Sequence, residues 1–163
     1  MKRLYIIRHA KSSWGDSNLK DFDRPLNKRG STDAPLMGEV LRTAKVEADL
    51  IISSPAKRAI TTAKIIAEAI DYKKAIEDKK EVYGADTQIM LNVVNQIDNK
   101  IKTLFIFGHN PTFTYFAEML SEVNIGNLPT TGIVGIEFDF DDWALVSSNT
   151  GNCFYYDYPK NHK

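Results

Sequence analysis

The sequence predicts an α/β protein, a three-layer α/β/α sandwich around a mostly parallel central sheet. Short apolar runs at residues 4–7, 49–53 and 103–108 lack polar alternation, as is typical of strands buried on both faces of a parallel sheet. Each run is followed, directly or after a loop, by a segment whose apolar residues have helical spacing. Beyond Gly132 the pattern changes to alternation, which predicts further, half-buried strands.

Length and composition favour a single domain, residues 1–163, without a linker, repeat or low-complexity segment. Basic and acidic residues both number 21, so the net charge is zero and does not support nucleic-acid or anionic-membrane binding. The single cysteine, Cys153, permits no intrachain disulfide and favours a reducing compartment. The apolar run after the basic residues 1–3 is too short for a signal sequence or a membrane span, so we expect a cytoplasmic protein.

A polar loop, residues 11–24, separates the first strand from the first helix and is long enough to be functional. We expect Trp14 and Phe22 to pin this loop to the body of the protein. Three of its side chains could donate hydrogen bonds to an anion held at the end of the first strand, namely Lys11, Ser12 and Arg24. The alternative for each of them is a solvated surface position.

The first helix is predicted over about residues 28–43, where apolar residues recur at helical spacing. Asn27 is a suitable N-cap, because its side chain can accept a hydrogen bond from the first turn. Gly30 and Pro35 weaken the first half and predict a frayed or kinked start.

The segment after the second predicted strand also has the features of a helix start. Ser54 is a suitable N-cap and Pro55 fits the first turn of a second helix. Farther along, we predict a short strand at 75–76, a loop at 81–86 and a helix over about 86–97.

The third buried strand is followed by Asn110 and Pro111, again a cap and a proline at the start of a helix. The C-terminal part predicts strands at 136–140, 143–146 and 153–158, separated by turns.

Four reactive or cationic residues lie where predicted strands end and helices begin: Arg8, His9, Arg58 and His109. In open α/β sheets, ligands bind beyond the carboxyl ends of the strands. Arginine offers a planar fork for phosphate, and histidine offers a nucleophile or general base near neutral pH. Individually, each could be a surface charge or a loop histidine, but together they predict a pocket for a phosphoryl group. His162, in the polar tail, is assigned to solvent.

These motifs resemble the histidine phosphatase superfamily, which has the phosphoglycerate mutase-like fold. The superfamily's Arg-His-Gly motif corresponds to Arg8-His9-Ala10, its second arginine to Arg58 after Ser54-Pro55, and its second histidine to Gly108-His109-Asn110-Pro111. The Arg-His-Ala-Lys variant, the segment 23–27 and the short length resemble the SixA branch, whose members are phosphohistidine phosphatases. The resemblance covers nearly the whole chain.

The resemblance implies a phosphohistidine enzyme intermediate on His9. Arg8, Arg58 and His109 would hold the phosphoryl oxygens, and Asn110 is an additional candidate contact. Neighbouring cations would keep His9 neutral by lowering its pKa. The implied reaction needs no cofactor and no metal.

The acid that protonates a leaving group in many members of the superfamily has no clear counterpart. Glu81 is the first candidate and Asp86 the second, and an exposed charge is the alternative for both. The expected partner is a protein that carries phosphohistidine, or a small phosphorylated substrate, and the expected state is a monomer. The remaining alternatives are a phosphatase of small phosphate esters and a non-catalytic phosphate-recognition module.

Overall fold

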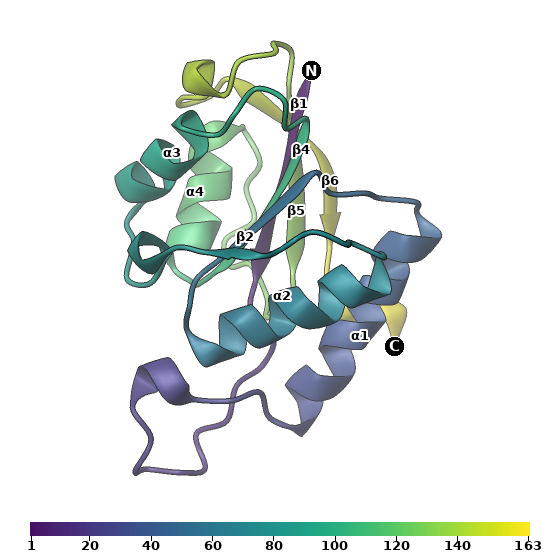
Figure 1. Ribbon diagram of the computed structural model, residues 1–163, viewed down its shortest axis with the longest axis vertical. Coiled ribbons are helices and arrows are strands. Elements are labelled where there is room, and N and C mark those ends of the chain that lie inside the picture. The colour runs from purple at the N-terminus through teal and green to yellow at the C-terminus, as the bar shows by residue number, and fades with distance from the viewer.

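The computed structural model describes residues 1–163 and places a six-stranded sheet between two pairs of helices (Figure 1). The order across the sheet is β3-β2-β4-β1-β5-β6. β3, β2, β4 and β1 are parallel, β5 is antiparallel to β1, and β6 is antiparallel to β5. The predicted mostly parallel sheet is therefore confirmed. The strands span Lys2–Arg8 (β1), Leu50–Ser53 (β2), Glu77–Asp78 (β3), Thr103–Gly108 (β4), Ile133–Phe138 (β5) and Gly151–Asp157 (β6).

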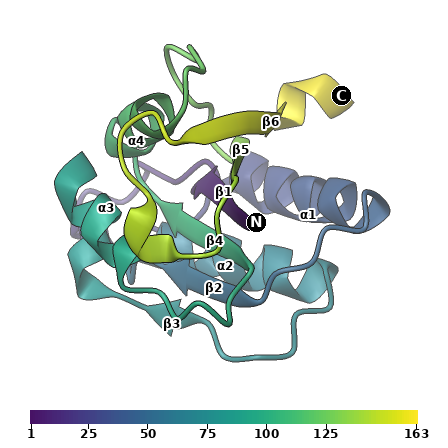
Figure 2. The same ribbon diagram turned by 90° about the horizontal axis from the view of Figure 1, so that it is seen from above.

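Two helices cover each face of the sheet, which makes the predicted three layers (Figure 2). α1 and α2 pack on one face, and α3 and α4 pack on the other. The helices span Lys28–Thr43 (α1), Lys57–Ala69 (α2), Thr87–Asn95 (α3) and Thr112–Leu120 (α4). Short 3-10 helices span Asp21–Asp23 (η1), Lys80–Val82 (η2), Trp143–Leu145 (η3) and Pro159–His162 (η4).

Alternation along the strands divides the apolar core into two halves. In β1, Leu4 and Ile6 face α3 and α4, whereas Tyr5 and Ile7 face α1 and α2. All four side chains are buried, as the unbroken apolar run predicts. β1 thus lies in the middle of the molecule, and its carboxyl end is held on both sides by β4 and β5.

The first helix differs from its prediction at its start. α1 is a continuous helix from Lys28, so the predicted frayed or kinked start is wrong. Asn27 is the N-cap as predicted, and its Oδ1 accepts a hydrogen bond from the Gly30 backbone N–H at 2.9 Å. Gly30 is needed because a Cβ there would overlap the carbonyl oxygen of Lys11. Glycine has a low helix propensity, but at position 30 its lack of a Cβ lets the backbone of Lys11 pack against α1.

Three other local predictions are wrong. The segment 143–146 is a 3-10 helix rather than a strand, and the buried indole of Trp143 donates to the Ile101 carbonyl oxygen at 2.8 Å. Ser54 does not cap α2, whose N-cap residue is Ala56. Trp14 does not pin its loop to the core, because 74% of its surface is exposed.

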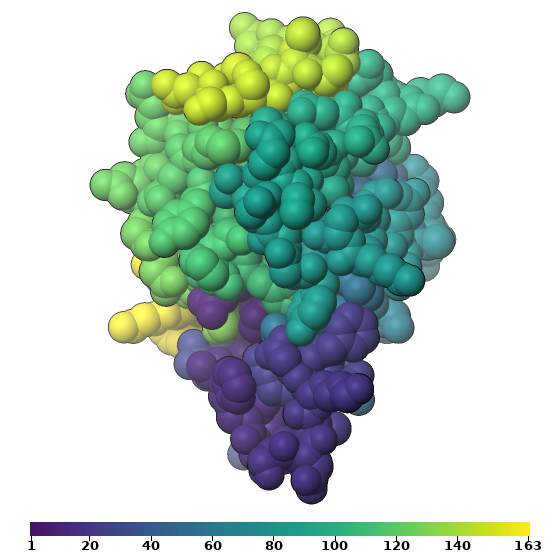
Figure 3. Space-filling model, turned by 90° about the vertical axis from the view of Figure 1, so that its left-hand side faces the viewer, coloured from purple at the N-terminus to yellow at the C-terminus, as the bar shows by residue number.

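The segment between β1 and α1 forms a tapered projection at one end of the molecule (Figure 3). Its backbone is tied to the body near α1, where the Asn27 N–H donates to the Lys11 carbonyl oxygen at 3.0 Å. An isolated bridge between Ser12 and Leu26 closes the base of the projection. No helix in the structure combines the length and the apolar character that a membrane crossing requires.

The close approach of α1 to the Lys11 backbone predicts a specific sensitivity. We expect Gly30→Ala to lower the free energy of unfolding by about 1–3 kcal/mol, because the new methyl group has no room. Gly15→Ala, in the projection between β1 and α1, is the matched control, since its Cβ would make an ordinary 3.4 Å contact with Ser13 Oγ. Urea denaturation measures both variants. Equal stability of the two would contradict the packing described here.

Candidate active site

The carboxyl ends of β1, β2 and β4 meet at one edge of the sheet because these strands are parallel and adjacent. The residues that follow them line a cavity of about 180 Å³. The structure brings together all four residues predicted from strand ends and the four predicted additional contacts. The cavity is lined by Arg8, His9, Lys11, Ser12, Trp14, Arg24, Arg58, His109, Asn110 and Thr130.

One ring nitrogen of His9 is hydrogen-bonded to the backbone, and the other has no hydrogen-bond partner. Its Nδ1 lies 2.7 Å from the Ala10 carbonyl oxygen, which can only accept, so Nδ1 carries the proton and Nε2 carries the lone pair. Only 8% of the residue is exposed. Burial, together with nearby His109 and Arg58, lowers the pKa of His9 to about 3. His9 is therefore a neutral imidazole with an available nucleophilic nitrogen.

His109 leaves β4 beside His9, with 5.3 Å between the ring centroids. Its Nε2 lies 2.8 Å from Ser54 Oγ, and that oxygen also accepts a hydrogen bond from the Ala56 N–H at 3.2 Å. When the Ser54 hydroxyl donates to Nε2, the ring proton of His109 lies on Nδ1 and is available as a donor. Burial and the Arg58 charge lower the pKa of His109 to about 4, so it too is neutral.

Each of the two arginines uses part of its guanidinium within the protein. Arg8 Nη1 donates to the Leu128 carbonyl oxygen at 2.9 Å. Arg58 Nη1 donates to the backbone oxygen of Asp21 at 2.7 Å, and Nη2 donates to its Oδ2 at 3.0 Å. These bonds fix the two planar groups against the cavity.

Three buried donors around the cavity have no hydrogen-bond partner: Arg8 Nε, Arg58 Nε and His109 Nδ1. Buried donors are rarely left unpaired, because each one has lost its water without a replacement. A tetrahedral oxyanion offers acceptors to several donors at once. This chemistry fits a phosphoryl group next to the free Nε2 of His9.

Three of the four additional residues are held by hydrogen bonds within the protein. Arg24 Nη1 donates to Ser12 Oγ at 2.7 Å, and its guanidinium stacks on Trp14 with 3.6 Å to the ring centroid. Asn110 Nδ2 donates to the Leu128 carbonyl oxygen at 3.0 Å and so holds the loop that also receives Arg8. Ser12, Arg24 and Asn110 therefore already have partners inside the protein.

Comparisons with known proteins agree with this geometry. The sequence profile of the histidine phosphatase superfamily (branch 1) matches residues 4–82, which include Arg8, His9 and Arg58. An uncharacterized protein of Mycobacterium tuberculosis is 32% identical over 118 residues, 72% of each chain. The chain belongs to the histidine phosphatase superfamily.

Two further comparisons define the extent of this relationship. An uncharacterized chloroplastic protein of Arabidopsis thaliana is 31% identical over 133 residues, which cover 76% of this chain and 61% of that protein. The structure of the protein histidine phosphatase SixA complexed with tungstate superimposes with a TM-score of 0.84 over 99% of both chains, at 21% identity. This member of the superfamily therefore has a SixA-like fold along its whole length.

The sequence analysis missed Asp21, whose carboxylate organises the outer side of this histidine phosphatase site. Its Oδ1 accepts from Arg24, and its Oδ2 accepts from Arg58 and from the Tyr83 hydroxyl at 2.7 Å. The Tyr83 hydrogen bond and the two arginines hold the pKa of Asp21 well below its usual range. Asp21 precedes Arg24 by three residues, a spacing that allows the two side chains to pair across the short 3-10 helix. This acid–base spacing is a sequence signal that could have identified Asp21.

The two predicted acids lie outside the histidine phosphatase cavity. Glu81 lines a separate cavity of about 290 Å³ beside α3, and Asp86 caps α3 by accepting from the Ile89 N–H at 2.8 Å. From the same stretch of chain it is Tyr83 that reaches the site, with its ring edge-on to His109 at 5.6 Å. Thr130 also lines the cavity and was not predicted.

No group of three or more histidine, cysteine, aspartate or glutamate side chains is arranged to hold a metal ion.

The lowered pKa values of His9 and His109 predict an acid-sensitive fold. Both histidines ionise near pH 6.5 when unfolded but only near pH 3 to 4 when folded. Below pH 6.5 the unfolded state binds more protons, so the stability that is complete above this pH falls as the pH falls. We expect a loss of roughly 2 kcal/mol per histidine between about pH 6.5 and about pH 4.5.

Urea denaturation across this range of pH measures the effect. His9→Ala and His109→Ala should each flatten the pH dependence, whatever their stability at neutral pH. His162→Ala, outside the cavity, is the matched control. A pH dependence that both site variants retain in full would contradict the assignment of two neutral, buried histidines.

Proposed function

We propose that this protein is a metal-independent phosphatase that removes the phosphoryl group from phosphohistidine on proteins. A single observation carries the proposal: the free Nε2 of a neutral His9 lies in one cavity with Arg8, Arg58 and His109, and each of these three side chains has a nitrogen without a partner in the protein. A nucleophile without these cations and donors would face the unscreened negative charge on the three equatorial oxygens of the transition state. The donors without a nucleophile would make only an anion-binding site.

In the first step, His9 Nε2 attacks phosphorus in line with the leaving group. The P–N bond to His9 forms as the P–N bond of the substrate breaks, and the proton on His9 Nδ1 stays hydrogen-bonded to the Ala10 carbonyl oxygen. Arg8, Arg58 and His109 donate to the equatorial oxygens, where negative charge accumulates. In the second step, water attacks phosphorus, inorganic phosphate leaves, and neutral His9 is restored.

The leaving group decides the substrate class. No carboxylic acid lines the cavity, and the nearby Asp21 is ionised and occupied by three donors. An alkyl phosphate departs as an alkoxide that needs a proton, whereas a phosphohistidine protonated on its other nitrogen departs as neutral imidazole. The conjugate acid of that imidazole has a pKa of about 6.5, so it leaves without an acid.

The comparisons support this proposal at the level of fold and ligand type. SixA is a protein histidine phosphatase, and its structure with tungstate shows that a fold of this kind takes a phosphate-like oxyanion. The cavity is also open at its rim, where Trp14 is largely exposed. An open rim suits a histidine presented on the surface of a protein substrate.

The nucleophile assignment predicts a trapped intermediate. We expect rapid quenching without acid to recover phosphate label on His9, and His9→Ala to abolish turnover while the protein stays folded. Arg58→Ala should lower kcat by about a hundredfold or more, the scale of losing one electrostatic donor. Arg42→Ala, which removes an exposed arginine paired with Glu39 on α1, is the control. Addition of a chelator should leave the rate unchanged. Label on another residue would refute the assignment.

The missing acid predicts an order of substrates. We expect kcat/KM to be highest for a phosphohistidine peptide or another phosphoramidate, lower for a nitrophenyl phosphate, and lowest for an alkyl phosphate. Glu81→Gln should preserve this order, because Glu81 lines a different cavity. If alkyl phosphates were the best substrates and Glu81→Gln selectively removed that activity, the phosphohistidine proposal would fail.

A further inference from the structure

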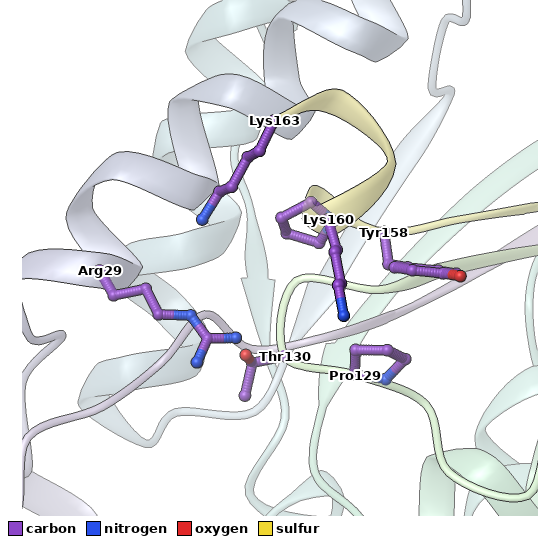
Figure 4. A pocket seen from close by; sticks show the side chains of 7 residues that line it. Arg29, Pro129, Thr130, Tyr158, Lys160 and Lys163 are labelled. Atoms are coloured by element: carbon purple, nitrogen blue, oxygen red, sulfur yellow. The ribbon is translucent and has the colours of Figure 1, made fainter.

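A second cavity lies beside the candidate active site and has no role in the reaction described above. Its volume is about 330 Å³. It opens between the first turn of α1, the loop before β5 and the C-terminal 3-10 helix (Figure 4). Six of its lining residues are labelled in that view: Arg29, Pro129, Thr130, Tyr158, Lys160 and Lys163. We refer to it as the basic cavity.

The lining of the basic cavity contains three cationic side chains and no aspartate or glutamate. Figure 4 shows Arg29, Lys160 and Lys163 extending from two separate elements toward a common space. The only acid paired with them is Asp33, which is fully buried behind Arg29 (3.4 Å) and Lys163 (2.7 Å). One buried carboxylate against three cations leaves a local excess of positive charge in a chain whose net charge is zero.

The other carboxylate of the C-terminal segment does not neutralise this excess. Asp157 accepts hydrogen bonds from Tyr155, Asn161 and His162. Lys160 has no ion-pair partner and is exposed. Its ammonium group is therefore available to a ligand without displacing an internal acid.

The basic cavity and the active-site cavity share a wall, because Thr130 lines both. The sheet topology explains why they are neighbours. β6 runs in the same direction as β1, and the register aligns Ile7 with Ile133 and Ile133 with Asp157. The C-terminal 3-10 helix thus begins just beyond the same sheet edge as Arg8, and two strand spacings, about 10 Å, separate the backbone of β1 from that of β6.

The first turn of α1 reinforces this link. Gly30 packs directly against the backbone of Lys11, a residue of the active-site cavity, and Arg29 is its neighbour in the chain. The chain segments that carry Arg29 and Lys11 are therefore in direct backbone contact.

We propose that the basic cavity binds a second anionic group of the substrate, a carboxylate or a phosphate held about 10 Å from the phosphoryl group. This inference rests on the phosphatase activity proposed above and narrows its substrate class. Arg29 offers a bidentate fork, and Lys160 and Lys163 offer point charges. Tyr158 and Pro129 supply an apolar wall for the carbon atoms that carry the anion. In an extended peptide, 10 Å corresponds to about three residues.

The test compares substrates that differ only in the second charge. One pair is a phosphohistidine peptide with aspartate three residues away and its asparagine counterpart. The other pair is a hexose bisphosphate and the matching hexose monophosphate. For wild-type protein, we expect kcat/KM to favour the more anionic member of at least one pair by about fivefold or more, through KM, and added salt to reduce that preference.

Variants then locate the preference. Lys160→Ala and Arg29→Gln should each reduce the ratio of kcat/KM within the preferred pair to near one. Lys100→Ala, an exposed lysine at the opposite end of β4, is the matched control and should leave both the ratio and the rate unchanged. The peptide pair and the hexose pair distinguish a protein carboxylate from a second phosphate as the source of the anion.

The outcomes separate this inference from the proposed function. If neither pair shows a preference, or if Lys160→Ala and Arg29→Gln retain it, the basic cavity is not a substrate subsite. If the peptides are not hydrolysed but the hexose bisphosphate is preferred in a Lys160-dependent way, the phosphohistidine proposal fails and the subsite stands. Loss of all turnover in both variants, with folding intact by circular dichroism, would also contradict the inference, because it would place the cations in the reaction itself.

Discussion

The parallel register of β1 and β4 is the constraint on which the site depends. Arg8 lies opposite Gly108, and the His9 N–H donates to the Gly108 carbonyl oxygen at 3.0 Å, so His9 and His109 leave neighbouring strands at the same level. A side chain at position 108 would overlap the ring of Phe113, which explains why the strand ends in glycine. A slip of one residue would turn every side chain of β1 to the other face of the sheet and separate the two histidines.

The remaining parts of the site are attached to this pair through backbone groups. The Ala10 N–H donates to Thr62 Oγ1 at 2.9 Å, and that hydroxyl donates to the Arg58 carbonyl oxygen at 2.7 Å, so α2 is docked on the loop after His9. Asp21 then holds the outer face of Arg58. Every bond orients the guanidinium yet leaves its Nε unpartnered. The guanidinium groups of Arg8 and Arg58 are thereby held in fixed positions at the wall of the cavity.

Burial lowers the pKa of both kinds of base in this pocket but changes the charge of only one kind. It keeps His9 and His109 neutral, whereas Arg8 stays charged because the pKa of a guanidinium begins so high. A neutral nucleophile is therefore surrounded by permanent cations. The same cations discourage protonation of His9 and attract the phosphoryl group, so one arrangement of charge serves both needs.

The sequence by itself determined the four α-helices, most of the strands and the four residues at strand ends, because apolar periodicity is local and a parallel sheet collects its carboxyl ends at one edge. Only the tertiary structure decided what depends on the path of a loop. Asp21 reaches Arg58 across 37 positions of the chain. Tyr83 rather than Glu81 packs against His109 and donates to Asp21, whereas Glu81 lines a different cavity. Such contacts join segments with no common periodicity, so no local pattern encodes them.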